Sequence, residues 1–239
     1  MIKFFRKIRY DLMEKNKTGK YFKYAIGEIF LVVIGILIAL TINNWNEAKK
    51  YTNDKIEFLN SIKNELLLDS KRADSLIVRY QKHLSYFNMI DSTFNLHEVD
   101  LMPLSDSSNV LNYRKLMNKP SAFVPNNGTY QSFIYYGSVK IVKNKELLIN
   151  LQKYYSIIED YNSGSYEKII SIESQLNWNR AYEKKYKPYK TIEDLNDKQF
   201  IAELNYFFDK IHDYLRLLFY VKGEANELIV EIDNELNKK

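Results

Sequence analysis

The chain has 239 residues, 46% of them apolar, which suits one folded domain with attachments. It contains no cysteine, which excludes disulfides, thiolate metal sites and cysteine nucleophiles, and its seven glycines and four prolines favour long helices. The net charge of +5 originates near the N-terminus, because residues 46–239 contain 27 basic and 27 acidic residues; this neutrality argues against a nucleic-acid partner, which would need a basic face.

Residues 1–24 are predicted to form a basic cytoplasmic tail. A helix over residues 2–14 would separate an apolar side from a basic side and lie on anionic lipid. The alternative is a charge block without fixed structure that only sets the orientation of the chain. In the first interpretation, the side chains that contact the inner-leaflet headgroups are Lys3, Arg6, Lys7 and Arg9.

Residues 25–45 are predicted to cross a membrane. They contain one charged residue, and a helix of this length spans about 30 Å, the thickness of a bilayer core. Tyr24 and Trp45 lie where aromatic belts form. A buried core helix and a cleaved signal peptide are the alternatives. An uncleaved anchor is favoured because the apolar run is longer than usual for either and no convincing cleavage site follows it.

The distribution of positive charge predicts the orientation. Eight Lys or Arg residues precede the run and few follow it closely, which places the N-terminus in the cytoplasm and residues 46–239 outside it. In a bacterium with two membranes, the protein would be a single-pass protein of the inner membrane with a periplasmic domain.

Small residues and one acid share a side of the predicted span. Gly35 and Ala39 have a spacing that lets two membrane helices approach closely. Glu28 is either a tolerated interfacial acid or a polar contact to another membrane helix. In the second interpretation, the contact residues are Gly27, Glu28, Gly35 and Ala39.

Two groups of sequence blocks are similar to those of a known family. The first comprises FFRKIR, YAIGEI, VVIGILIAL and INNWNE, and the second is YYGSVKIVKNKELLINLQKYYSIIEDYN, residues 135–162. They resemble the domain of unknown function DUF6090, a family of small single-pass membrane proteins of Bacteroidetes-type bacteria. The resemblance implies a membrane anchor followed by a helical extracytoplasmic region. It implies no activity, because the family has none assigned.

Residues 46–239 are predicted to form a helical domain. Apolar residues recur every three or four positions over residues 54–95, 144–176 and 201–236. Long helices with one apolar stripe bury those stripes best in a bundle. The predicted fold is therefore all-α, with one transmembrane helix followed by an antiparallel bundle of roughly four helices.

Turn residues predict the breaks between these helices. Residues 96–124 are expected to be a loop with a short helix near Val110–Met117. Thr129 is expected to cap a second short helix, and Asn144 the next long one. The stretch Asn162–Ser165 is either a break or a weakened turn, and a continuous helix is the favoured interpretation.

No recognisable catalytic or metal-binding motif occurs in the sequence. None of the three histidines lies in an H-x-x-x-H pattern, and neither a nucleophile elbow nor a glycine-rich phosphate loop is found. Asp209, His212 and Asp213 could share a helix face, but such trios are common on solvated surfaces. Catalytic residues, cofactors and metals are not expected. An acidic stripe that is expected to face water comprises Glu224, Glu227, Glu231 and Glu235.

Tyrosine is unusually frequent, and 17 of the 20 tyrosines lie beyond residue 50. A large apolar ring with a hydroxyl suits interfaces and ligand pockets. The simpler interpretation, which is favoured, is that these rings pack at the margins of the bundle while their hydroxyls reach water.

These observations favour a non-enzymatic, membrane-anchored interaction or sensory module. Its expected partners are membrane lipid and either another protein or a second copy of the chain. About 25 residues before the span are too few for an output domain, so a signal would pass to a partner. The alternatives are an envelope-associated hydrolase with dispersed catalytic residues and a purely structural envelope protein.

Overall fold

The computed structural model describes residues 10, 18–88, 119–136, 141–179, 181 and 198–238. Over these residues the regular structure is helical, and none of them lies in a strand, so the prediction of an all-α protein is confirmed for this part of the chain. The chain divides into two compact units, residues 1–55 and 56–239. The predicted boundaries at residues 24 and 45 depend on a membrane and stay predictions.

Helix α2 (Thr18–Asn88) has 71 residues and begins in the first unit. It contains an 18-residue window with a mean hydropathy of 2.7, none of which is buried. By length and composition, this helix can cross a membrane. Its apolar residues there lie on all sides, because consecutive residues of an α-helix point about 100° apart and the four residues 31–34 are all apolar and 40–62% exposed.

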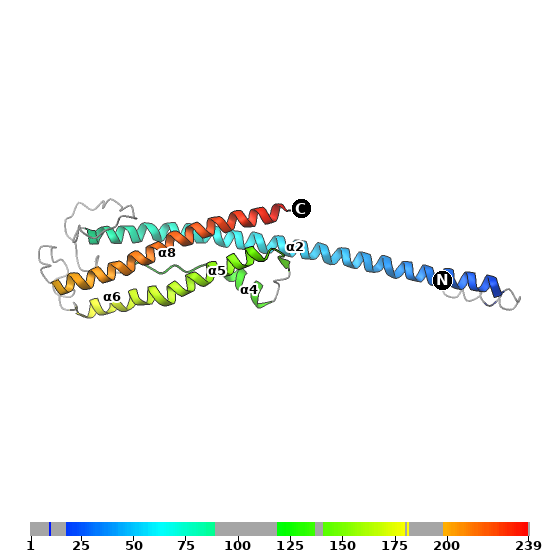
Figure 1. Cartoon of the computed structure of the whole chain (residues 1–239), viewed down its shortest axis with the longest axis horizontal. Coiled ribbons are helices and arrows are strands. Elements are labelled where there is room, and N and C mark those ends of the chain that lie inside the picture. Colours follow the sequence, from blue (N-terminus) through cyan, green and yellow to red (C-terminus); the bar gives the residue numbers. More distant parts are fainter. Residues whose placement is uncertain are drawn as a thin grey trace. The chain divides into compact units, whose positions relative to one another are not determined.

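In the second unit, residues 56–88 of α2 pack with α5 (Lys145–Tyr161), α6 (Glu167–Asn179) and α8 (Lys198–Asn237), which lie side by side in Figure 1. The predicted apolar stripe is confirmed as far as residue 87, since its members there are 0–7% exposed, whereas its last two members, Ile90 and Phe94, lie outside the described residues. The buried members are Phe58, Leu59, Ile62, Leu66, Ala73, Leu76, Tyr80 and Phe87. Each fully buried Leu, Ile or Phe side chain contributes about 1.5–3 kcal/mol relative to exposure, so apolar burial dominates the stability of this unit.

Polar contacts give the relative directions of these helices. Residue numbers rise along α2 and along α5–α6 as they fall along α8, so α8 runs antiparallel to both. The pairs between α2 and α8 are Lys63–Asp233, Ser70–Asn226 and Asp74–Lys222. The pairs between α5–α6 and α8 include Asn144–Glu235, Asn150–Glu231 and Asn162–Tyr214. It follows that α2 and α5–α6 run parallel to each other.

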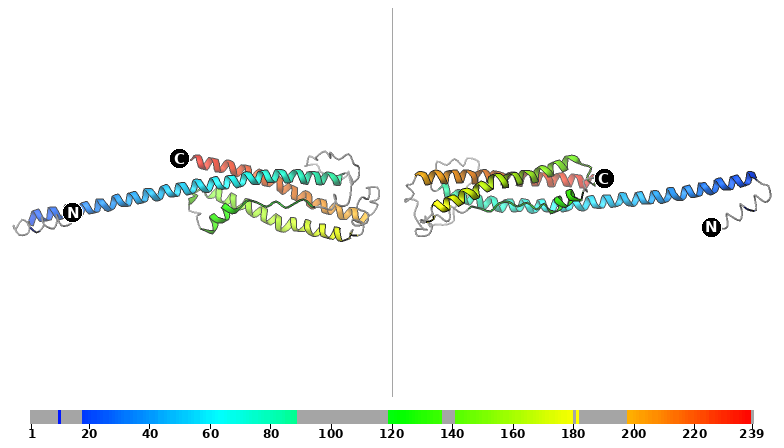
Figure 2. Two further views of the ribbon diagram at one scale, coloured as in Figure 1. Left: turned by 180° about the vertical axis from the view of Figure 1, so that it is seen from behind. Right: turned by 90° about the horizontal axis from the view of Figure 1, so that it is seen from below.

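Residues 119–127 return along these parallel helices in an extended conformation, and we call them the extended segment (Figure 2). At one end Lys119 bonds to Glu173 of α6, and at the other Asn126 bonds to Asp69 of α2. Pro120 and Pro125 disfavour a helix here, because proline lacks an N–H and restricts the preceding residue. The predicted loop is confirmed over residues 119–124, whereas the predicted helix near residues 110–117 lies outside the described residues.

The extended segment leads into the short helix α4 (Gly128–Tyr135). The prediction that Thr129 caps this helix is wrong, because the N-cap is Asn127, whose side chain makes no capping bond. Thr129 instead donates its N–H and its hydroxyl to Glu65 Oε1 of α2, at 2.9 and 2.8 Å. A carboxylate from a neighbouring helix thus accepts from the first turn of α4, which a local capping rule does not foresee.

Two predictions for the stretch from Asn144 to α6 are confirmed. The Asn144 side chain accepts from the Leu147 N–H at 3.2 Å and caps α5. A π-helical turn, η2 (Asn162–Tyr166), joins α5 to α6, so the helix is continuous but altered. Ser163 bonds back to the carbonyls of two preceding residues, and Gly164 has weak helix propensity, which together explain the wider turn.

Candidate functional site

The extended segment is held by side chains of the surrounding helices rather than by a strand partner. Hydrogen bonds reach its backbone from α2, α5, η2 and α8. We call this set of side chains the cradle. Its members are Asp69, Tyr80, Tyr155, Asn162, Tyr166 and Tyr214.

Phe123 is held at both of its backbone polar groups. Its N–H donates to the Tyr214 hydroxyl at 2.9 Å, and its carbonyl accepts from Asn162 Nδ2 at 2.9 Å. The Tyr214 hydroxyl donates in turn to Asn162 Oδ1, which closes a ring of three bonds. Asn162 opens the π-helical turn, so the irregular turn supplies the amide that completes this ring. The Phe123 side chain itself is fully buried.

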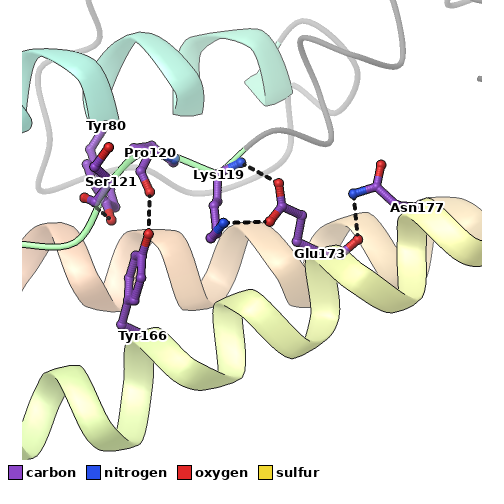
Figure 3. Close-up of polar contacts among 7 residues, drawn as sticks. All are labelled: Tyr80, Lys119, Pro120, Ser121, Tyr166, Glu173 and Asn177. Atoms are coloured by element: carbon purple, nitrogen blue, oxygen red, sulfur yellow. Dashed lines mark hydrogen bonds and ion pairs between the residues drawn. The ribbon is translucent and has the colours of Figure 1, made fainter.

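Two further tyrosines bind the start of the segment (Figure 3). The Tyr166 hydroxyl donates to the Pro120 carbonyl at 3.0 Å, and the Tyr80 hydroxyl donates to the Ser121 carbonyl at 3.3 Å. Glu173 accepts from the Lys119 N–H at 3.2 Å and pairs with the Lys119 ammonium group at 2.9 Å. The segment is therefore held from α2 on one side and from the η2–α6 rod on the other.

Asp69 anchors the far end of the segment. This carboxylate is fully buried, and its Oδ1 accepts from both the N–H and the side-chain amide of Asn126, at 2.8 and 2.7 Å. Its Oδ2 accepts from the Tyr154 hydroxyl at 3.1 Å. Tyr155 donates to the Asn126 carbonyl at 3.2 Å, so both backbone groups of Asn126 are also occupied. A carboxyl group can be buried here because three donors offset part of the cost of its desolvation.

Burial controls ionisation in the cradle. Desolvation raises the pKa of Asp69, although the bonds from Asn126 and Tyr154 and the charge of Arg72 lower it in part. Desolvation also raises the pKa of Tyr214 to about 12 and the pKa of Tyr80 well above its usual value. The tyrosines therefore remain neutral hydroxyls at physiological pH and serve as hydrogen-bonding groups, not as acids or bases.

The cradle is made of hydrogen-bonding groups that are already paired with the segment. A perturbed carboxyl group often marks an active site, but both oxygens of Asp69 are already occupied by Asn126 and Tyr154. Within the described residues, no group of three or more His, Asp or Glu is placed to hold a metal ion, and this includes Asp209, His212 and Asp213. Neutral donors and acceptors are complementary to the amide and carbonyl groups of a peptide.

An open groove of about 450 Å³ follows the extended segment where it lies along α2. Its charged lining residues are Arg72 and Arg79. Arg72 donates to the Val124 carbonyl, and the Val124 side chain is 60% exposed. One side of the segment is therefore open to solvent, while Phe123 points into the core.

The site residues predicted for the membrane lie elsewhere. Gly27, Gly35 and Ala39 are exposed on α2, and a side chain added at either glycine would meet nothing within 4 Å in the described chain. Glu28 is half-buried on the same helix. Their role in helix pairing stays a prediction. The predicted lipid contacts lie outside the described residues; they are Lys3, Arg6, Lys7 and Arg9.

Two sequence predictions about polar side chains need correction. Tyr80, Tyr154 and Tyr214 are fully buried with hydroxyls bonded inside, so the expectation of hydroxyls in water is wrong for them. Glu235 does not face water: it is 6% exposed and accepts from Asn144. The position of Tyr80 within the apolar stripe of α2 could have indicated its burial. A hydroxyl buried at such a position needs a hydrogen-bond partner inside the protein.

Comparison with protein families gives a match to a family of unknown function (DUF6090) over residues 28–210. The matched range confirms the resemblance seen in the sequence, and it contains every cradle residue except Tyr214. No curated protein and no solved structure matches the chain.

Proposed function

We propose that this chain, which belongs to the family of unknown function DUF6090, is a membrane-anchored interaction or sensory module without catalytic activity. One observation carries the proposal: the apolar window of α2, with a mean hydropathy of 2.7, is not covered by any described part of the chain. Apolar surface left in water costs about 25 cal/mol per Å². A bilayer removes that cost for a helix of this length.

The proposed topology follows from charge. The basic N-terminal tail lies in the cytoplasm of a bacterium, α2 crosses the inner membrane once, and residues 46–239 lie in the periplasm. The proposed domain is an antiparallel bundle of roughly four helices that comprises the second part of α2, α4, α5–α6 and α8. Membrane lipid is a partner of the tail and of the span.

The second unit favours binding over catalysis. Both oxygens of its fully buried carboxylate, Asp69, already accept hydrogen bonds from inside the domain. Its surface exposes large aromatic side chains: Tyr135, Tyr136 and Trp178 are 77–84% exposed. Aromatic residues are enriched in protein interfaces, where they bury much area at little entropic cost. A protein partner or a second copy of the chain is therefore the proposed ligand of this domain.

Introduced cysteines test the topology, because the chain has none of its own. In cells with a permeabilised outer membrane, Trp178→Cys should react with a membrane-impermeant maleimide, whereas Tyr10→Cys should react only after the inner membrane is opened. The opposite pattern would overturn the orientation. Release of the unlabelled protein into the supernatant after detergent-free lysis would overturn the anchor.

Site-specific photocrosslinking in native membranes tests the interaction. A crosslinking residue at Tyr135 should give a discrete adduct that mass spectrometry identifies as one partner or as the chain itself. The matched control is Val230, which is 59% exposed and lies on α8. Monomer alone from both positions, and from Trp178, would contradict an interaction role.

A further inference from the structure

We propose that α2, α5–α6 and α8 form a peptide-binding groove, that the extended segment occupies it as a built-in ligand, and that another extended polypeptide with a bulky apolar anchor residue can take its place. The identity of the occupant as a polypeptide rests on the proposed function, because a module of that kind binds a protein. The groove itself rests on the contacts of the cradle.

Most hydrogen bonds of the cradle go to the backbone of the segment rather than to its side chains. The carbonyls of Pro120, Ser121 and Phe123 accept from Tyr166, Tyr80 and Asn162. The N–H groups of Phe123 and Asn126 donate to Tyr214 and Asp69. Backbone amides and carbonyls are common to all polypeptides, so these bonds supply affinity for any extended chain, as they do when a peptide is added to the edge of a sheet.

Selectivity in this groove comes mainly from one apolar pocket, to which the contacts of the Asn126 amide with Asp69 and of the Lys119 ammonium with Glu173 are added. Phe123 is the one residue of the segment that is fully buried, while Ser121 and Val124 are exposed. By contrast, α8 buries fourteen residues. Removing the segment takes one fully buried side chain out of the core, whereas removing α8 would dismantle the core. The helices therefore retain most of their mutual burial when the segment leaves.

The lining of the groove also suits exchange. Hydroxyls, the Asn162 amide and the Asp69 carboxylate can all bind water once the segment has left, so the empty groove is not an apolar void. The segment is already open to solvent on the side where the 450 Å³ cavity lined by Arg72 and Arg79 lies. An incoming chain can therefore displace the segment from this open side. Once bound, the incoming chain makes the same backbone hydrogen bonds to the cradle.

Peptide binding by the full-length protein in detergent micelles tests the proposal. Phe123→Ala empties the anchor pocket, and the probe is a synthetic peptide with the sequence of residues 119–127, KPSAFVPNN. The matched control peptide carries alanine in place of its phenylalanine. We expect the first peptide to bind the Phe123→Ala protein at least tenfold more tightly than the control peptide and to raise its Tm with concentration. Adding Tyr214→Phe to the protein should weaken this binding several-fold.

Equal binding of the two peptides, or no binding to a Phe123→Ala protein that retains its helical circular dichroism, would overturn the proposal. Should that variant not fold, hydrogen exchange of the unaltered protein decides. The amides of Phe123 and Asn126 should exchange through a local opening, at least 100-fold faster than the slowest amides of α8. Hydrogen exchange of both sets of amides at one common rate would show that the segment leaves only on global unfolding. That result would refute the replacement of the segment by another chain. Neither measurement requires a membrane, so failure here is separable from failure of the anchor.

Discussion

Two stretches of one helix, residues 25–45 and 56–88 of α2, have the same backbone and opposite side-chain patterns. In the first, large apolar residues lie on every side and are 40–67% exposed. In the second, most of them form one stripe that is 0–7% exposed. Leu37 and Leu68 make the contrast direct, because they are 55% and 56% exposed yet are proposed to meet lipid and water respectively. The same helical backbone therefore suits either environment. What distinguishes the two stretches is whether apolar residues lie on all sides of the helix or on one side.

The largest effect is expected from charges in the first stretch. Ile34→Arg combined with Leu37→Arg should cost about 5–7 kcal/mol of membrane insertion, since each arginine at a helix centre costs roughly 2.5–3.5 kcal/mol. The double variant should lose its place in the carbonate-washed membrane fraction. Leu68→Arg, at the same exposure as Leu37, should remain there. Equal retention of the double variant and the unaltered protein would contradict the assignment of solvent.

A cavity in the second stretch should have the next largest effect. Leu66 is fully buried and Leu67, its neighbour, is 39% exposed. Leu66→Ala should lower the free energy of unfolding by about 2–5 kcal/mol, through lost burial and the cavity left behind. Leu67→Ala should lower it by less than about 1 kcal/mol. Urea unfolding of the purified protein in detergent measures both, and equal losses would show that the two faces of this helix are not distinguished by a core.

Removing one hydroxyl from the cradle should have a smaller effect. Tyr214→Phe leaves the Phe123 N–H without its acceptor and Asn162 Oδ1 without its donor. Two buried groups without partners should lower the free energy of unfolding by about 1–3 kcal/mol. Tyr206→Phe on the same helix is the control, because Tyr206 is 53% exposed and should change stability by less than about 0.5 kcal/mol. A loss of the same size in both variants would argue against the ring of bonds.

The smallest effect is expected from Asp69→Asn, and it should depend on pH. Asparagine retains an oxygen for Asn126 and can donate to the Tyr154 hydroxyl, so the bonds at this site can persist. Burial raises the pKa of Asp69 above its unfolded value of 3.8, so the folded state binds more protons. The protonated aspartate therefore adds to the free energy of unfolding below pH 3.8, and this addition is lost as the pH rises through the raised pKa.

The unaltered protein should therefore lose stability relative to Asp69→Asn as the pH rises above about 4, the ordinary pKa of an aspartate. Unfolding curves of the two proteins at a series of pH values measure this difference. Since every other carboxylate is shared by both proteins, its titration cancels in the comparison. A difference that does not change with pH would mean that desolvation does not control the ionisation of Asp69.

Much of the fold was predictable because it depends on local signals. The helical stripe of α2 follows from residue spacing, and the Asn144 cap follows from capping chemistry. The continuity of the helix through residues 162–166 follows from an apolar stripe that extends past this stretch. The cradle was not predictable in this way. Its bonds join residues 29 to 91 positions apart, such as Phe123 and Tyr214, and no local pattern encodes such a pairing.

The sequence by itself determined an apolar stretch of bilayer length, the charge asymmetry beside it and helices with one buried stripe, because periodicity and composition act within one element. Only the tertiary structure decided that an extended segment lies against these helices and that tyrosine hydroxyls face inward to hold it. It also buried Glu235 and placed Glu65 at the first turn of α4. The reason is physical: a buried polar group needs a partner, and which partner lies within 3 Å depends on how distant parts of the chain pack.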